Sequence, residues 1–212
     1  MMNMDLSLLL TRVITLVIAF TVHEFSHALT AVKLGDETPR RDGRLTLNPL
    51  KHLDLFGTLM LIASGFGWAK PVTINTWAVN RKTKAGVMLV SLAGPLSNFL
   101  LAVIGAICFK FVPASSSYSK IYPTPSYFLM NFILINLNLM VFNLVPLAPL
   151  DGEKVLDYFI RGSFRPVWEN IQQYGTYILI IVFFILPYLR IDIFGAVLSP
   201  IVSALFHLLI NR

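Results

Sequence analysis

The stretch TVHEFSHAL, residues 21–29, places two histidines and a glutamate at positions 23, 24 and 27 of a long apolar run. In a helix, residues four apart lie on one face, so His23 and His27 can direct imidazole nitrogens at one metal ion. Glu24 follows the first histidine and can take a proton from water at that ion, as in a zinc peptidase. Each ionisable group at membrane depth costs on the order of 2.5 kcal/mol or more, so a chance trio is disfavoured.

A catalytic zinc site has three protein ligands, so the two histidines need a third. Asp151 is the expected one, because it lies in the segment NLVPLAPLDG, residues 143–152, whose two prolines must break or end a helix near the level of His27. An N-cap carboxylate for a helix that starts near Glu153 is the alternative role of Asp151. The remaining acids considered are expected across the membrane or in a solvated loop: Asp5, Asp192, Asp36, Glu37 and Asp42.

The elements around these residues have the composition of a membrane protein. Of the 212 residues, 56% are hydrophobic and 13% are charged, and apolar runs of 18 or more residues recur along the chain. The first run, residues 6–34, is too long for the apolar part of a signal peptide, so we expect a retained helix. The formal net charge of +6 is attributed to loops near anionic lipid rather than to nucleic-acid binding.

The predicted fold is an all-α polytopic membrane protein with about six transmembrane helices and a small membrane-associated β-sheet on the cytosolic side. Partial alternation in GRLTLNPL and KPVTINTWAV indicates the strands, and the glycine-interrupted run at residues 55–68 indicates a re-entrant piece. We expect one domain over residues 1–212. Its segments are a helix (6–34), the strands with the re-entrant piece (35–84), a helix (85–112), a helix with the NLVPLAPLDG segment (127–152) and two short C-terminal helices (174–210).

Lys and Arg gather in the loops at residues 35–84 and 150–173, and the positive-inside rule places both loops in the cytosol. Counted at about 1.5 Å per residue from residue 6, His23 lies roughly 25 Å along the first helix. The site is therefore expected inside the membrane but nearer its cytosolic face. The predicted location is the cell membrane of a prokaryote, in which the chain is a multi-pass integral protein.

Two motifs together resemble the site-2 protease family of intramembrane zinc metalloproteases. HEFSH in the first long helix matches the HExxH pattern of that family, and NLVPLAPLDG two spans later matches its distal NxxPxxxxDG pattern. Residues 48–58, 67–72 and 93–98 are also similar to family segments. The chain departs from many relatives in size, because none of it could form the PDZ or CBS domain that they carry.

The resemblance implies that His23, His27 and Asp151 bind one Zn²⁺ per chain and that Glu24 is the catalytic glutamate. It also implies that Asn143 donates a hydrogen bond to the substrate backbone or to the developing oxyanion. Helix capping and helix packing are the rival uses of Asn143.

A hydrolytic zinc site within the bilayer predicts an endopeptidase that cleaves a transmembrane segment of another protein near its cytosolic end. Extended substrate could add to the predicted sheet at KPVTI, residues 70–74. A zinc transporter or metal-sensing membrane protein is the alternative, although a transporter should offer ionisable groups at several depths. A catalytically silent protein that binds membrane helices is the third possibility, and the presence of Glu24 argues against it.

Two polar residues near these motifs have no assigned role. His52 could pair with Asp54 close to the site, or it could fix a turn. Asn98, together with Gly94 and Pro95, is expected to shape a kinked and closely packed helix rather than to take part in chemistry.

Overall fold

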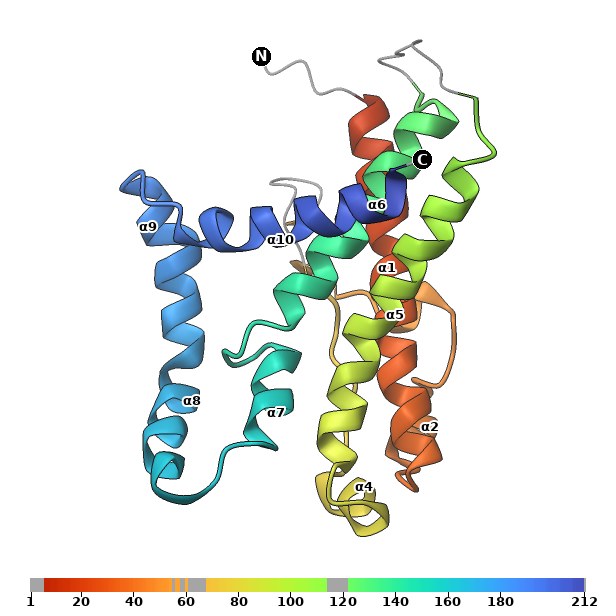
Figure 1. Ribbon diagram of the computed structural model, residues 1–212. Helices are drawn as coiled ribbons and strands as arrows, with labels where there is room; N and C mark the ends of the chain where they lie inside the picture. The colour runs from red at the N-terminus through yellow and green to blue at the C-terminus, as the bar shows by residue number, and fades with distance from the viewer. Residues whose placement is uncertain (1–5, 55, 58–59, 61–67, 114–121, 212) are drawn as a thin grey trace.

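Three long helices form the body of the protein, which is known from a computed structural model (Figure 1). They are α1 (Leu6–Lys33), α5 (Gly86–Phe109) and α6 (Pro125–Asn143), and each is long and apolar enough to cross a membrane. The structure describes residues 6–54, 56–57, 60, 68–113 and 122–211. α1 and α5 begin and end within three residues of the helices expected at 6–34 and 85–112, and α6 begins two residues before the one expected from residue 127.

Small and polar side chains form one buried row on α1. Residues four apart make a ridge inclined to the helix axis, and such ridges fit between those of neighbouring helices. Small residues matter here because helices in lipid associate through close packing rather than through apolar burial alone. The row consists of Ser7, Thr11, Thr15, Ala19, His23, His27 and Ala31. The same close packing that joins the helices therefore also buries both histidines.

A similar row of buried residues runs along α5, which packs against both α1 and α6. This row consists of Gly86, Val90, Gly94, Asn98, Ala102 and Ala106. Its last two residues continue into an apolar core that α5 shares with α6 and α10 (Ile193–Ile210). Ile133 and Leu137 of α6 are fully buried in that core. The site thus lies on a tightly packed scaffold.

Short helices complete the described part of the chain. On the N-terminal half they are α2 (Thr38–Arg41), η1 (Pro49–Lys51) and α4 (Thr76–Lys82). After α6 come α7 (Asp151–Asp157), η2 (Gly162–Phe164), α8 (Arg165–Ile180), η3 (Ile181–Ile185) and α9 (Leu186–Tyr188). In Figure 1, α2 and α4 lie at one end of the bundle, and α8 stands to one side of it.

The predicted β-sheet is wrong. Among the described residues there is no strand, and one isolated antiparallel bridge joins Leu53 to Ala69. Both supposed strands instead run into helical turns, because the side chains of Asn48 and Asn75 accept hydrogen bonds from Leu50 N–H and Ala78 N–H as N-caps. The proposed addition of substrate to a sheet edge loses its basis. Most of the expected re-entrant piece at residues 55–68 lies outside the described residues.

The expectation of about six spans is also wrong for the described part of the chain, where three helices qualify. The apolar run at residues 174–210 does not make two crossings. Its helix ends near Pro187, the backbone turns at Arg190, whose φ is 62°, and α10 then runs across the bundle rather than along it (Figure 1). A residue with positive φ cannot continue a helix, so the apolar run forms two helical segments that point in different directions.

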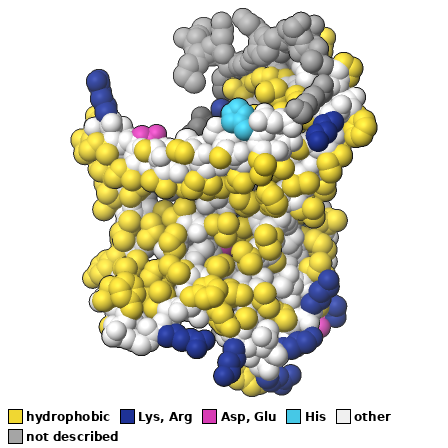
Figure 2. Space-filling model, in the orientation of Figure 1, with side chains coloured by type: hydrophobic (Ala, Val, Ile, Leu, Met, Phe, Trp, Pro, Cys, Tyr) yellow, Lys and Arg dark blue, Asp and Glu magenta, His cyan; other side chains and the backbone are white. Residues whose placement is uncertain are grey.

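The surface agrees with a membrane protein. Figure 2 shows hydrophobic side chains over the middle of this face, and Lys and Arg gather at the end where α2 and α4 lie. Large apolar side chains on α1 are exposed to the surroundings, as lipid-facing residues are. They are Leu6, Leu10, Ile14 and Ile18.

Candidate metal centre

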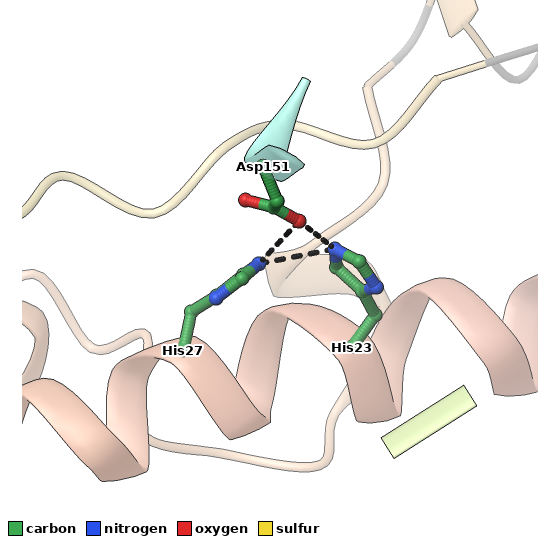
Figure 3. A group of neighbouring side chains, drawn as sticks. All are labelled: His23, His27 and Asp151. Carbon is green, nitrogen blue, oxygen red and sulfur yellow. Dashed lines mark hydrogen bonds and ion pairs between the residues drawn. The ribbon is translucent and has the colours of Figure 1, made fainter. Parts of the chain in front are cut away.

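Three side chains from α1 and α7 converge on one point (Figure 3). His23 Nε2 and His27 Nε2 are 3.0 Å apart, and Asp151 Oδ2 lies 3.1 Å from the first and 3.3 Å from the second. Two ligands at about 2.0–2.1 Å from a tetrahedral zinc are about 3.3 Å apart, so these spacings suit that ion. Two imidazole nitrogens and one carboxylate oxygen are also a donor set that catalytic zinc uses. The residues present therefore fit Zn²⁺.

Asp151 is placed by the break after α6. The helix α7 begins at Asp151 itself, its N-cap is Leu150, and no side-chain cap bond is formed, so the N-cap alternative is not what the structure shows. A Cβ on Gly152 would overlap the carbonyl oxygens of Leu144 and Val145. Glycine thus lets α7 start in contact with the end of α6, and this brings the carboxylate to the histidines.

Asp151 directs one carboxylate oxygen at both histidines, because its Oδ2 is the atom that lies beside the two imidazole Nε2 atoms. An ionised carboxylate is the form that binds a metal ion.

Each histidine is held through its other ring nitrogen. His23 Nδ1 lies 2.6 Å from Asn98 Oδ1, and His27 Nδ1 lies 2.7 Å from the carbonyl oxygen of Val90. A carbonyl oxygen can only accept, so His27 carries its proton on Nδ1 and leaves the lone pair of Nε2 for a metal.

The same tautomer of His23 follows from a chain of amides that ends on a backbone carbonyl. The carbonyl of Phe132 accepts from Asn136 Nδ2 at 2.8 Å, so Asn136 Oδ1 must be the acceptor for Asn98 Nδ2 at 3.2 Å. Asn98 therefore turns its Oδ1 toward His23 and accepts from Nδ1–H. Three helices take part in this chain, and all three side chains are buried.

Gly94 allows α5 to pass directly beside the histidines. A Cβ built on this residue would overlap His27 Nε2 and would lie 2.6 Å from His23 Nε2. Any side chain here would occupy the space where the ligands converge. The glycine that the sequence assigned to helix packing is thus also a condition for the metal site.

Glu24 and Asn143 both line the cavity at this site, which has a volume of about 130 Å³. Glu24 is 8% exposed, and its Oε2 accepts a hydrogen bond from Val72 N–H at 3.0 Å. Asn143 is at the end of α6 and donates one hydrogen of Nδ2 to the carbonyl of Leu139 at 2.9 Å. The other lining residues are His23, His27, Pro71, Val72, Ile74, Ser91, Pro149, Asp151 and Lys154. All five residues expected at the site therefore surround one cavity.

Known proteins resemble this chain over most of its length. A family model described as Peptidase family M50 matches residues 114–186, which include Asn143 and Asp151. YwhC of Bacillus subtilis (strain 168), which carries the name of a zinc metalloprotease, is 41% identical over 184 residues, or 86% of this chain and 83% of YwhC. The chain belongs to peptidase family M50.

Other relatives of this M50 chain are mycobacterial. Rip2 of Mycolicibacterium smegmatis is 32% identical over 200 residues, which cover 86% of this chain and 73% of Rip2. Rip2 of Mycobacterium tuberculosis (strain H37Rv) is 29% identical over 187 residues, which cover 85% of this chain and 68% of that Rip2. Both also carry the name of a zinc metalloprotease, and no solved structure matches the chain. As a member of the site-2 protease family, the chain is a membrane zinc metalloendopeptidase with Zn²⁺ as cofactor.

Sequence reasoning missed two buried charges in this M50 protein. Arg44 is 6% exposed and Asp36 is 1% exposed, although both belong to a region assigned to a solvated loop. His52 is fully buried and fixes a turn, since its Nε2 lies 2.7 Å from the carbonyl of Thr46. The position of Asp36 three residues beyond the end of α1 was the available signal, because acids there can hold the next turn; nothing comparable marks Arg44.

Proposed function

We propose that this protein cleaves transmembrane segments of other membrane proteins, with His23, His27 and Asp151 holding Zn²⁺ and Glu24 acting as general base and acid. The observation that carries the proposal is the convergence of these three donors beside Glu24, where His23, Glu24 and His27 belong to a helix long and apolar enough to span the membrane and Asp151 comes from α7. A hydrolytic site at that depth suits a substrate that is itself in the bilayer.

Each residue has a distinct part in the proposed reaction. When bound, zinc polarises the scissile carbonyl and lowers the pKa of water at the site. Glu24 removes a proton from the attacking water and then delivers it to the leaving amine. Asn143 uses one Nδ2 hydrogen for Leu139, and its second can be donated to the substrate carbonyl. Asn98 and the Val90 carbonyl keep the two imidazoles in the tautomer that binds metal.

The hydrogen bonds of a helix bear on how a substrate can reach the site. A peptide carbonyl within a helix accepts a hydrogen bond from the N–H four residues further on and is shielded by the surrounding turns. We therefore propose that the substrate enters as a locally unwound stretch, whose peptide carbonyls are no longer shielded in this way.

The charge distribution supports a site near the cytosolic face of the cell membrane. Lys and Arg gather at the end of the bundle that carries α2 and α4 (Figure 2). His27 lies six residues before the end of α1 at Lys33, or about 9 Å at 1.5 Å per residue. By the positive-inside rule that end is cytosolic.

The test is cleavage of a panel of single-pass membrane substrates in liposomes by wild type and by Glu24→Gln at equal zinc content. We expect wild type to cut within the membrane segment and Glu24→Gln to lose roughly 10²- to 10⁴-fold in rate, the usual contribution of a general base. Mass spectrometry of the products gives the cut site. Equal cleavage by both proteins would contradict the role of Glu24, and zinc flux without cleavage would favour a transporter.

A further inference from the structure

We propose that residues 70–75 form a fixed wall of the active site whose Val72 N–H positions the carboxylate of Glu24, and that Arg44 and Asp36 hold this wall in place. The inference rests on the proposed role of Glu24 as the base. It makes Arg44, Asp36 and the backbone of Val72 positioning groups, none of which touches the metal ligands in the contacts described above.

The central contact joins a backbone donor to the carboxylate. Val72 N–H donates to Glu24 Oε2 at 3.0 Å, and both residues line the cavity. A glutamate side chain has several rotatable bonds and needs such a contact to keep one orientation. With Oε2 held by a charge-assisted hydrogen bond, Oε1 is the oxygen left to act on water.

Arg44 holds the other side of the same peptide group. Its Nη2 donates to the carbonyl oxygens of Lys70 at 2.6 Å and Pro71 at 2.8 Å. The Pro71 carbonyl and the Val72 N–H belong to one planar unit and point in opposite directions, so fixing the oxygen fixes the direction of the N–H. The positive guanidinium also polarises this peptide and strengthens its donation to Glu24.

Asp36 holds the far end of the segment. Its Oδ2 accepts from Asn75 N–H at 2.7 Å, and its Oδ1 accepts from Thr38 N–H at 2.9 Å. At the near end, Lys70 N–H donates to the carbonyl of His52 at 2.8 Å. A segment tied at both ends through buried residues is a wall rather than a lid that opens with each turnover.

The kinetic test compares two proline substitutions. Val72→Pro removes the donor to Glu24, whereas Ile193→Pro places the same ring on the exposed first residue of α10, a helix position that tolerates proline, away from the cavity. We expect Val72→Pro to lower kcat roughly 10- to 100-fold, as loss of a hydrogen bond to a charged group does, with KM and zinc content nearly unchanged. Ile193→Pro should stay within about threefold of wild type. Wild-type kcat in Val72→Pro at full zinc content would overturn the proposal.

Amide hydrogen exchange, resolved to single residues, tests the contact without substrate or zinc. We expect the Val72 amide to exchange slowly in wild type and at least about 10-fold faster in Glu24→Ala, while the Asn75 amide is unchanged. Asp36→Asn, which has one side-chain oxygen in place of two, should speed exchange at Asn75 or Thr38 instead. Rapid exchange at Val72 in wild type, or no effect of Glu24→Ala, would overturn the proposal. Because this readout needs no cleavage, a failed protease assay with slow Val72 exchange would count against the proposed function and not against the wall.

Discussion

Asn98 is the residue through which the packing of three helices determines the protonation of His23, a proposed metal ligand. It accepts from His23 Nδ1 and donates toward Asn136, so the proton of His23 stays on the nitrogen that faces away from the metal. Residues that hold a histidine ligand in this way commonly contribute 10- to 100-fold to metal affinity.

We therefore expect Asn98→Ala to weaken zinc binding about 10- to 100-fold, with the helices still folded. Competition with a chelator of known affinity measures this change. Asn138→Ala is the matched control, because Asn138 is an exposed asparagine of α6 whose side chain bonds only its own helix in the contacts described here. Equal zinc affinity in wild type and Asn98→Ala would show that the Asn98 contact does not tune the site.

At the scale of residues, the sequence predicted which side chains lie together at the site but not which residues hold the histidines in place. His23, Glu24 and His27 are four residues apart or fewer, so helical periodicity alone puts them together, and the break at NLVPLAPLDG suggested Asp151. The contact between Asn98 and His23 spans 75 positions of sequence. It depends on where two helices cross, which residue types and local spacing do not determine.

At the scale of elements, a group of polar side chains joins α7 to α8. Asp157 Oδ1 accepts from Arg165 Nη1 at 2.8 Å, Trp168 Nε1 at 2.9 Å and Gln172 Nε2 at 3.1 Å. Gln172 also bonds Glu153, so Glu153 and Asp157 of α7 both face α8. Since α7 begins with Asp151, these contacts with α8 support the helix that carries the Asp151 carboxylate.

We expect Asp157→Ala to destabilise the protein by about 1–2 kcal/mol, a value discounted because the pair with Arg165 is partly exposed to solvent. Thermal unfolding in detergent measures the loss. Glu169→Ala removes a more exposed partner of Arg165 and should change stability by less than about 0.5 kcal/mol. If both substitutions had the same small effect, α8 would not depend on Asp157.

The long helices were predictable because a run of apolar residues long enough to span lipid has few other ways to satisfy its backbone. The predicted strands were wrong, because the alternation of apolar and polar residues was only partial and nearby residues favour the start of a helix. Asn48 precedes a proline and Asn75 precedes a threonine, and both are good helix starts. Around residues 70–75 the backbone groups bond to Arg44 and Asp36 rather than to a neighbouring strand.

For the whole molecule, zinc at the proposed site would join parts of the chain that are far apart in sequence, since the donors come from α1 and from α7. An ion that binds the folded state and not the unfolded state stabilises folding by about 2.7 kcal/mol at 100 times its Kd. We expect a chelator to lower the thermal midpoint of wild type and to have little effect on His27→Ala, which lacks one donor. His207→Ala, at an exposed position of α10, should respond to the chelator as wild type does. A chelator shift of wild-type size in His27→Ala would argue against these ligands.

The buried row on α1 determines how this helix is rotated about its own axis relative to its neighbours. Ser7, Thr11 and Thr15 face neighbouring helices through the same four-residue step that later presents His23 and His27. Inserting one residue between Thr15 and His23 would rotate the two halves relative to each other by about 100°. Either the packing residues or the histidines could then keep their partners, but not both. The first helix therefore cannot change its length independently of its chemistry, even at positions that lie several turns from the metal.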